Sequence, residues 1–302
     1  MKISVIIVTQ NRKELLSLCL NKLGEQQLRP IEVIVLDNGS TIDSELFLRS
    51  FDFSNKQITL KKVFFKKNMG LTYARNRGAE KASGEIIVWM DNDTFFEDPS
   101  ALTLILNEFE KDSDLKILTY PVHEILSDNT ERYLIPRPRT PYKYNQEFET
   151  SYFLGGANAM RTEMFKKYGM FDEKLVYQLE ELDFTYKIAR DKIKIKYVPA
   201  IEIIHKPPHA KFHSDRFYYF HVRNRIWIAC RYLPQPYFTV HISIWIFRLF
   251  FKSLIDLKII AFLKGMIEGI LYIPENFKLR KKMKLSRESV QWLQRRYGRV
   301  WY

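Results

Sequence analysis

Short apolar runs alternate with amphipathic stretches over the first 120 residues of the chain. The β-branched runs 3–8 and 31–36 are typical of buried strands, and turn residues flank them. Between such runs, apolar positions recur with the period of a helix. The expected strands are 3–8, 31–36, 58–65 and 85–90, and the expected helices are 12–26 and 71–82. This alternation predicts βαβ units, and therefore an α/β fold with a mainly parallel sheet flanked by helices.

The pattern changes twice in the rest of the chain. Residues 120–150 lose their periodicity and contain four prolines, which predicts a long functional loop. Order resumes with expected helices over 161–167 and 180–190 and expected strands over 193–198 and 201–204. From residue 217 onward the stretches are long, helical and rich in aromatic residues. We therefore predict an α/β domain over residues 1–215 and a helical, basic extension over residues 216–302.

The extension contains an apolar region, residues 237–273, in which charges recur every four residues at Arg248, Lys252 and Asp256. This spacing predicts amphipathic helices with a narrow polar stripe. The charges interrupt the region too often for the ~18 uninterrupted apolar residues of a helix that crosses a bilayer. We expect these helices to lie on an anionic membrane surface. The alternative is that they pack against the rest of the chain or form a homodimer.

The net charge of +13 is concentrated near the end of the chain, in residues 278–284 and 295–299. A basic segment of this kind attracts polyanions. Composition alone leaves three candidates, which are nucleic acid, anionic lipid head groups and a phosphorylated acceptor.

The two cysteines, Cys19 and Cys230, lie far apart in apolar surroundings. We expect buried thiols in a reducing compartment rather than a disulfide. The first apolar run is too short for the core of a signal peptide. These features predict a cytoplasmic protein, attached peripherally to the inner face of the plasma membrane if the apolar helices bind lipid.

Two aspartates, Asp91 and Asp93, follow the fourth expected strand. Open α/β sheets bind ligands at the carboxyl ends of their strands, so a ligand is expected beside this pair. Two carboxylates suit Mg²⁺ or Mn²⁺, which typically complete their coordination with phosphate oxygens and water. The alternative is an acidic turn that closes a strand. The chain has no Gly-x-Gly-x-x-Gly after its first strand and no Walker sequence, so other groups would have to hold the phosphates of a nucleotide.

Several short segments occur in a fixed order along the first half of the chain, namely 9–12, 37–40, 68–70, 74–78 and 91–93. As an ordered set they resemble family 2 glycosyltransferases over roughly residues 3–205. The resemblance implies the GT-A fold, a Rossmann-like nucleotide-sugar-binding domain with its donor half over residues 1–120 and its acceptor half over 150–215. It also implies an inverting, metal-dependent transfer of a sugar from a nucleotide-diphosphate donor to an acceptor hydroxyl.

The resemblance assigns most of these residues to the donor site. Asp37 would contact the base or ribose of the nucleotide, and Asp91 and Asp93 would hold the metal. The other donor-site residues that it implies are Thr9, Asn11, Arg12, Asn38, Asn68, Gly70, Arg75 and Asn92. A buried aspartate can accept a hydrogen bond from a ribose hydroxyl, and a glycine lets the backbone approach a ligand closely. Taken singly, a turn or a helix cap would also explain these residues.

A further acidic group, Glu180, Glu181 and Asp183, begins the expected helix 180–190. In the family this region carries a Glu-Asp pair whose second member is the general base. The resemblance therefore places the base at Glu181, where Glu stands for the usual Asp, and Glu180 and Asp183 stay alternatives. Carboxylates in the first turn of a helix also interact favourably with its dipole, which would explain the group without catalysis.

His205 follows the expected strand 201–204. The family often has a histidine here that completes the metal or diphosphate site. A neutral imidazole can bind Mn²⁺, and a protonated one can donate to phosphate. The alternative is a histidine with a structural role.

Residues 223–227 and the helices behind them resemble bacterial rhamnosyl- and galactofuranosyl-type transferases that build surface polysaccharides. This resemblance implies a glycan or lipid-linked acceptor. A processive polysaccharide synthase would carry a Gln-x-x-Arg-Trp motif, which residues 291–295 do not match. A nucleic-acid-binding protein would interleave basic and aromatic residues across its fold, whereas the densest basic run here follows an apolar region, so no nucleic-acid partner is expected. A donor-binding module without activity stays an alternative because of the Glu at position 181.

Overall fold

The computed structural model describes residues 2–55, 57–126, 128–136, 145–207, 213–296 and 300. The chain forms two compact units. Unit 1 comprises Met1–Glu173 and Lys194–His209, and unit 2 comprises Lys174–Ile193 and Ala210–Tyr302. The sequence predicts a single boundary near residue 215. The structure differs because the segment Lys174–Ile193 buries its apolar side chains with those of the C-terminal helices.

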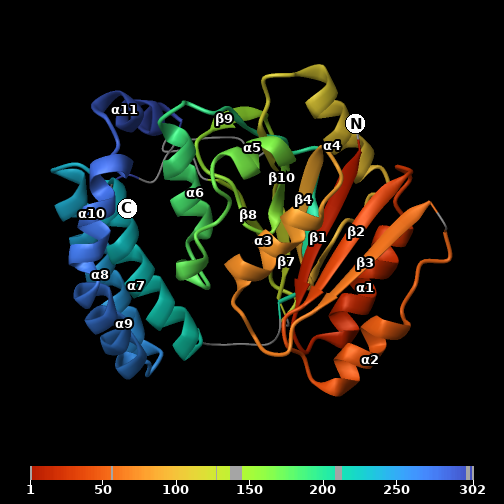
Figure 1. Cartoon of the computed structure of the whole chain (residues 1–302), viewed down its shortest axis with the longest axis horizontal. Helices are drawn as coiled ribbons and strands as arrows, with labels where there is room; N and C mark the ends of the chain where they lie inside the picture. Colours follow the sequence, from red (N-terminus) through yellow and green to blue (C-terminus); the bar gives the residue numbers. More distant parts are fainter. Residues whose placement is uncertain are drawn as a thin grey trace. The chain divides into compact units, whose positions relative to one another are not determined.

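Unit 1 is built on a mixed sheet whose described strands follow the order β3-β2-β1-β4-β10-β6-β11-β9 (Figure 1). The first four strands are mutually parallel, namely β1 (Ile3–Thr9), β2 (Ile31–Asp37), β3 (Ile58–Phe64) and β4 (Ile86–Asp91). The others are β6 (Ile117–Thr119), β9 (Phe148–Thr150), β10 (Ala157–Arg161) and β11 (Ile195–Tyr197). Strand β10 runs antiparallel to β4 and β6. The predicted α/β fold with a mainly parallel sheet is confirmed for the first four strands, and the sheet is mixed beyond them.

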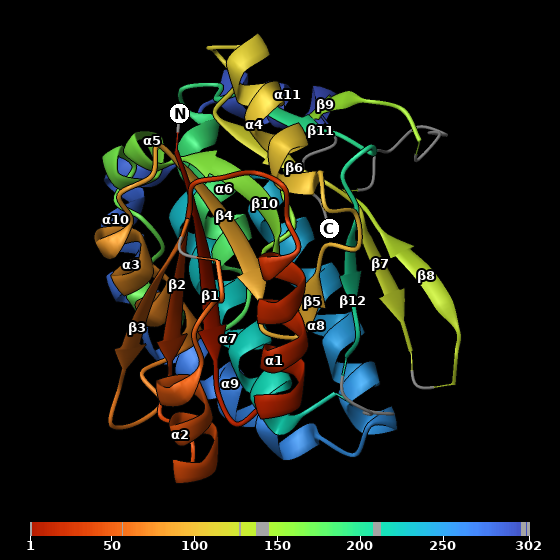
Figure 2. The ribbon, with the colours of Figure 1, turned by 90° about the vertical axis from the view of Figure 1, so that its right-hand side faces the viewer.

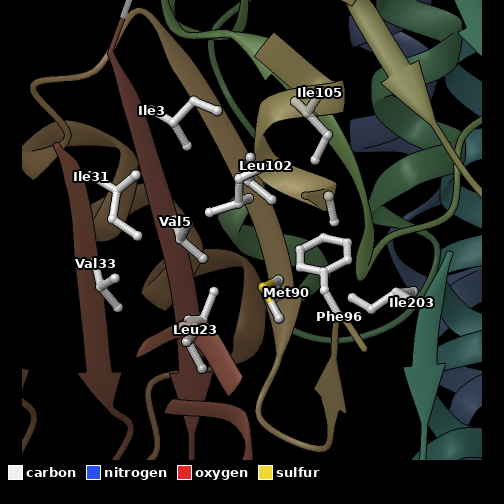
Figure 3. Packing of buried hydrophobic residues seen from close by; sticks show 14 of the residues in the cluster. Ile3, Val5, Leu23, Ile31, Val33, Met90, Phe96, Leu102, Ile105 and Ile203 are labelled. Atoms are coloured by element: carbon white, nitrogen blue, oxygen red, sulfur yellow. The ribbon is translucent and has the colours of Figure 1, made fainter. Parts of the chain in front are cut away.

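Helices cover both faces of this sheet. On one face, α1 (Lys13–Gly24), α2 (Ile42–Ser50) and α4 (Ala101–Lys111) share one buried apolar cluster with Ile3, Val5 and Ile7 of β1. Figure 3 shows Ile3 and Val5 in this cluster with Leu23 of α1 and with Leu102 and Ile105 of α4. On the other face, Gly78 of α3 (Leu71–Lys81) lies against Ile6 of the same strand. Successive residues of a strand point to opposite faces, so β1 must be apolar on both. The short helix α5 (Thr162–Lys167) follows β10.

A second, smaller sheet occupies part of the predicted loop (Figure 2). Its described strands, in spatial order, are β5 (Thr94–Phe95), β12 (Ile203–His205), β7 (Val122–Ile125) and β8 (Glu131–Leu134). The prediction of a loop over 120–150 is wrong for β7, β8 and β9. These strands are short and β8 exposes polar residues, so they show no apolar alternation. Residues 137–144 of the predicted loop lie outside the described residues.

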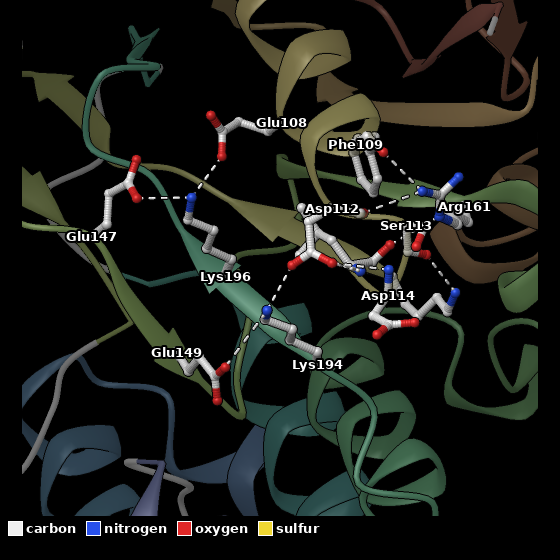
Figure 4. A network of polar contacts seen from close by, with 12 residues as sticks. Glu108, Phe109, Asp112, Ser113, Asp114, Glu147, Glu149, Arg161, Lys194 and Lys196 are labelled. Atoms are coloured by element: carbon white, nitrogen blue, oxygen red, sulfur yellow. Dashed lines mark hydrogen bonds and ion pairs between the residues drawn. The ribbon is translucent and has the colours of Figure 1, made fainter.

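Ion pairs fix β11 where the chain re-enters unit 1 (Figure 4). Lys194 Nζ lies 2.6 Å from Asp112 Oδ2. Lys196 Nζ lies 2.6 Å from Glu108 Oε2 and 2.8 Å from Glu147 Oε2. These pairs tie β11 to α4 and to the segment before β9. They therefore help to set the position from which the chain continues into β12 and His205.

Unit 2 is helical in the part that the structure describes. Its helices are α6 (Glu180–Ala189), α7 (Asp215–Tyr232), α8 (Tyr237–Ile255), α9 (Ile259–Leu271), α10 (Ile273–Met283) and α11 (Arg287–Arg295), and a 3₁₀ turn spans Glu173–Leu175. Helix α7 contributes to two apolar clusters. Trp227 and Ile228 pack with residues of α6 and α11, whereas Val222 and Ile226 pack with residues of α8 and α9. Helix α7 is therefore the centre of this unit.

Among the described residues, helix α8 has the length and the apolar composition of a helix that could cross a membrane. It contains Arg248 and Lys252 as its charged residues, because Asp256 lies just after its last residue. With these two charges α8 meets the length and composition of a span, so the expectation that charges exclude a span stays a prediction for this helix. Only 17% of its most apolar window is buried. Length and composition do not separate a helix that crosses a bilayer from one that lies on its surface.

Both cysteines are free and buried, as predicted. Cys19 belongs to α1 and Cys230 to α7. Burial raises the pKa of both thiols, to about 11 for Cys230 and still further for Cys19.

Candidate active site

Three parallel strands end side by side at one edge of the large sheet. In register, Thr9 of β1 pairs with Asp37 of β2, and Val8 pairs with Asp91 of β4. This is the edge at which open α/β sheets bind ligands. The structure thus brings the last residues of β1, β2 and β4, which the resemblance assigns to the donor site, to one edge of the sheet.

Asp37 and Asn38 organise the loop that follows β2. Asp37 is buried, and its Oδ1 accepts a hydrogen bond from the Ser40 amide at 2.8 Å. Asn38 is also buried, and its Oδ1 accepts from the Met69 amide at 2.9 Å while its Nδ2 donates to Asn68 Oδ1 at 3.2 Å. The loop after β2 is therefore joined to the segment that precedes α3.

Two further contacts complete this edge. Asn11 has a positive φ of 54°, and its Oδ1 accepts from the Thr41 amide at 2.5 Å. Asn68 Nδ2 donates to Gln10 Oε1 at 2.7 Å. Gly70, with φ of 95°, precedes α3 in a conformation that favours glycine. Gln10 and Ser40 belong to the segments 9–12 and 37–40 of the ordered set, but the sequence assigned neither side chain a role of its own.

Asp91 meets a buried arginine. Helix α3 carries Arg75, whose side chain is 3% exposed and whose Nη2 lies 2.9 Å from Asp91 Oδ1. The Asp91 side chain is 44% exposed, so its carboxylate is open to solvent. A Cβ on Gly156 would lie 2.3 Å from Asp91 Oδ2, so no side chain fits there without moving the carboxylate. Gly156 is a site residue that the sequence alone did not identify.

Asp93 lies between an arginine and a histidine side chain. Arg12 Nη1 pairs with Asp93 Oδ2, and His205 Nε2 lies 3.5 Å from Asp93 Oδ1. Strand β12 brings His205 here by pairing it with Thr94. The other ring nitrogen, Nδ1, lies 3.0 Å from Glu124 Oε1, a partner that the sequence gave no reason to expect. Nearby, Asn92 Nδ2 donates to Thr9 Oγ1 at 2.8 Å.

The electrostatics of this cluster favour charged forms. Burial by itself would raise the pKa of Asp93, but His205 and Arg12 outweigh it and the pKa is lowered. Burial would likewise lower the pKa of His205, but Asp93, Asp91 and Glu124 outweigh it and the pKa is raised. The cluster therefore holds an ionised Asp93 beside an imidazole that is more basic than usual.

No three His, Cys, Asp or Glu side chains in the described part of the chain converge as a ready-made metal site. Asp91 and Asp93 nevertheless offer hard oxygen donors on either side of Asn92. Mg²⁺ and Mn²⁺ sites often contain one or two protein carboxylates, and phosphate and water supply the other ligands. The chemistry of these residues fits a cation that binds together with a diphosphate.

The candidate bases lie in unit 2, in the first turn of α6. Asp183 is fully buried, with Arg231 Nη1 at 3.5 Å from its Oδ1 and Lys187 Nζ at 3.1 Å from its Oδ2. Glu180 is 2% exposed, whereas Glu181 is half-buried. Two cations thus enclose Asp183, and Glu181 is the most accessible of the three carboxylates.

Residues 4–169, more than half of the chain, match the model of Glycosyl transferase family 2. The chain belongs to this family. It is therefore a glycosyltransferase, as the ordered motifs predict.

Two named proteins are similar in sequence to this family 2 glycosyltransferase. The uncharacterized glycosyltransferase YwdF of Bacillus subtilis is 28% identical over 213 residues, which cover 68% of this chain and 74% of the relative. The cholesterol galactosyltransferase of Borreliella burgdorferi is 26% identical over 212 residues, which cover 65% of this chain and 58% of the relative. The chain thus spans little more than half of the second relative.

Solved structures identify the fold. Mannosyltransferase PcManGT from Pyrobaculum calidifontis, in complex with GDP-Man and Mn²⁺, has a TM-score of 0.59 at 18% identity, covering 93% of this chain and 73% of that chain. S. aureus TarS 1-349, in complex with UDP-GlcNAc, has a TM-score of 0.64 at 18% identity, covering 98% and 89%. The family 2 chain thus has the predicted GT-A fold.

Proposed function

We propose that this glycosyltransferase is inverting and metal-dependent, and that it moves a sugar from a nucleotide-diphosphate donor to a hydroxyl of a glycan or lipid-linked acceptor. The observation that carries the proposal is the edge of unit 1, where Asp37 and Asp91 end β2 and β4 on either side of β1, and Asp93 lies just beyond β4. The titles of two solved structures with this fold, which name GDP-Man with Mn²⁺ and UDP-GlcNAc, support a donor of this class.

The donor site divides between nucleoside and diphosphate. Asp37 accepts from the base or ribose, and the network through Thr9, Asn11, Asn38, Asn68, Gly70 and Asn92 fixes the loops around it. Asp91, Asp93 and His205 would hold Mg²⁺ or Mn²⁺, and the cation would supply positive charge against the nucleoside diphosphate leaving group. Arg12 and Arg75 already offset the negative charges of Asp93 and Asp91. Both arginines can therefore turn toward phosphate when the donor binds.

The base is Glu181. The acceptor oxygen attacks the anomeric carbon, the bond from that carbon to the diphosphate oxygen breaks, and the acceptor proton passes to the Glu181 carboxylate. Glu181 is more accessible than Glu180, and two cations enclose Asp183. These contacts favour a structural role for Asp183.

A panel of nucleotide sugars tests the donor site directly. With Mn²⁺ or Mg²⁺ present, a matching donor at about 100 times its Kd should stabilise the protein by roughly 2.7 kcal/mol. The gain should disappear in excess chelator. Stabilisation without release of nucleoside diphosphate would identify a donor-binding module that lacks activity, and no stabilisation by any donor would contradict the proposal.

Glu181→Gln tests the base. The amide keeps the size of the side chain but cannot accept the proton, so turnover should fall about 10²–10⁴-fold while donor affinity changes little. Glu180→Gln and Asp183→Asn are the matched controls. If one of them carries the loss instead, the base is that residue.

The partner of the apolar helices is an anionic membrane on the cytoplasmic side. Large apolar side chains are exposed in α8, in the turn after it and in α9, among them Phe247, Phe251, Ile255, Leu257, Ile260, Ile267 and Leu271. The basic run 278–284 follows them in α10. Each Lys or Arg near an anionic surface contributes about 1 kcal/mol, which supplements the insertion of apolar side chains.

Liposome co-sedimentation tests the membrane partner. Binding should require anionic lipid and weaken steeply with salt. Leu257→Asp, at a side chain 88% exposed in unit 2, should reduce binding, whereas Ile42→Asp, at a side chain 69% exposed in unit 1, should not. A protein that ignores anionic vesicles at low salt and sediments as a dimer would show that these helices assemble two copies instead.

A further inference from the structure

The turn that precedes α6 has an unusual backbone. Val176, Gln178 and Leu179 all have positive φ, at 63°, 72° and 68°. This left-handed region favours glycine, and a β-branched residue such as Val176 is especially disfavoured there. Conformations of this kind persist only where surrounding contacts enforce them, and they cluster at functional sites.

Asn224 of α7 supplies those contacts. Its side chain is fully buried. Its Nδ2 donates to the carbonyl oxygens of Leu175 at 3.0 Å, Tyr177 at 2.9 Å and Gln178 at 2.8 Å. An amide nitrogen has two hydrogens, so three carbonyl oxygens of one turn share the donors of one side chain. The backbone of the turn is therefore held by hydrogen bonds from a single side-chain nitrogen atom.

Arg223 strengthens this arrangement in two ways. Its Nε donates to Asn224 Oδ1 at 3.0 Å, which directs the amide nitrogen of Asn224 toward the turn. Its Nη2 donates to the carbonyl oxygens of Lys174 at 2.8 Å and Leu175 at 3.0 Å. Glu268 of α9 lies 3.2 Å from its Nη1. Together, Arg223 and Asn224 contact the backbone of most of the segment that leads into α6.

We propose that Arg223 and Asn224 are positioning residues for the general base, acting through the turn 175–179. Leu179 directly precedes Glu180 and Glu181, so the backbone angles of the turn set the direction in which α6 begins. The two side chains hold the turn in a conformation that its own residues disfavour. This inference rests on the proposed function. It adds the two residues that fix the direction of the Glu181 carboxylate.

Asn224→Ala and Asn224→Asp remove the donor, and the aspartate keeps the size of the side chain. Both should lower kcat about 10- to 100-fold, because a small misplacement of a catalytic group has effects of this size. The KM for the nucleotide sugar should change less than about twofold, because no donor-site residue is altered. Tyr218→Phe is the matched control. It removes a buried hydrogen bond from the same helix, the one to Asp256 at 2.5 Å, and should leave kcat unchanged.

Gln178→Gly separates positioning from a general loss of structure. Glycine adopts the left-handed conformation without strain, so the turn would need less enforcement. In the Asn224→Ala background it should recover at least about threefold of the lost kcat, since relief of one strained residue offsets part of the missing hydrogen bonds. Hydrogen exchange of the amides of residues 175–181 should be faster in Asn224→Ala than in wild type and slower again in the double variant.

The outcomes divide cleanly between the two proposals. A normal kcat in Asn224→Ala, or an equal loss in Tyr218→Phe, would overturn the positioning role. Faster exchange in residues 175–181 of Asn224→Ala with no change in kcat would do so too, because the turn would then be irrelevant to the base. If wild-type protein releases no nucleoside diphosphate from any donor, the proposed function fails. The exchange experiment alone then decides whether Asn224 holds the turn.

Discussion

A network of polar contacts around acidic side chains lies at each end of the parallel strands of unit 1. The two networks differ in the partners of their carboxylates and in the solvent exposure of Glu32 and Asp91. At the amino end, Glu32 of β2 accepts from Ser4, from the Ser83 amide at 2.9 Å and from Ser83 Oγ at 2.9 Å, and pairs with Lys61 at 2.6 Å. Its side chain is 1% exposed. At the carboxyl end, Asp91 also meets a cation, yet its side chain is 44% exposed.

A carboxylate with charged and polar partners is therefore no sign of function by itself. Hydroxyl and amide donors of the chain surround Glu32 and leave no room for a ligand. Asp91 and Asp93 pair mainly with arginine and histidine side chains, and in the proposed function a metal ion and phosphate take the place of those partners. The position at the carboxyl ends of the strands distinguishes the second network, together with the exposure of Asp91, whereas Asp93 is itself buried.

Asp93→Asn, at the carboxyl ends of the strands, should give the largest loss of turnover. The amide cannot supply the charge that a divalent cation needs, so turnover should fall about 10³-fold, which corresponds to the several kcal/mol that metal assistance provides. The measurement is steady-state release of nucleoside diphosphate over a series of Mn²⁺ concentrations. Undiminished activity in the variant, or in wild type with excess chelator, would contradict the metal assignment.

Glu32→Gln should affect stability and leave turnover unchanged. Burial tends to raise the pKa of Glu32, but Lys61, Ser4 and Ser83 lower it to about 2. The stabilisation is therefore present above pH ~4.5, the usual value, and is lost as the pH falls toward 2. At neutral pH it amounts to about 2 kcal/mol, less than the full pKa difference because solvent screens the partly exposed Lys61.

Urea titrations of Glu32→Gln between pH 3 and 7 check this prediction. The difference in unfolding free energy from wild type should be largest at neutral pH and should shrink toward pH 3. A difference that is independent of pH would show that packing, not charge, gives Glu32 its role.

Two glycines provide the smallest and sharpest comparison. A Cβ on Gly156 would meet the end of the Asp91 side chain, whereas a Cβ on Gly84 would lie 2.7 Å from the Ser4 amide nitrogen and 2.8 Å from the Lys2 carbonyl oxygen. Gly156→Ala should therefore rotate a carboxylate and weaken activation by Mn²⁺ about tenfold. Gly84→Ala must move backbone and should lose roughly 1–3 kcal/mol of stability with turnover intact. The opposite pattern would mean that the two ends have been assigned the wrong way round.

The sequence predicted the donor side of the fold better than the rest. Strands β1, β2 and β4 are buried on both faces and give long apolar runs, so their ends at Thr9, Asp37 and Asp91 could be located. Strand β12 of the second sheet was expected at 201–204, but β7 and β8 are short and partly exposed, and their polar residues give no alternation that would predict a strand. Glu124 reaches His205 only through the pairing of β7 with β12, a contact between residues far apart in the chain.

The acidic group of α6 shows where sequence patterns stop being informative. Glu180, Glu181 and Asp183 look equivalent along the chain, but Asp183 is enclosed by Arg231 and Lys187. Arg231 comes from another helix, and helical periodicity does not reveal which side chains meet across an interface. The left-handed turn before α6 could not be predicted either, because Val, Gln and Leu do not indicate a positive φ.

The burial of both thiols makes the natural chain suitable for site-specific chemistry. Thiol reagents attack the thiolate, and Cys19 and Cys230 are both shielded from solvent and hard to ionise. A cysteine introduced at an exposed position would therefore react with a maleimide first, with the native cysteines left in place. Position 257, beside the apolar helices, and position 42, in unit 1, would then accept an environment-sensitive dye, and only the dye at 257 should report the approach of lipid.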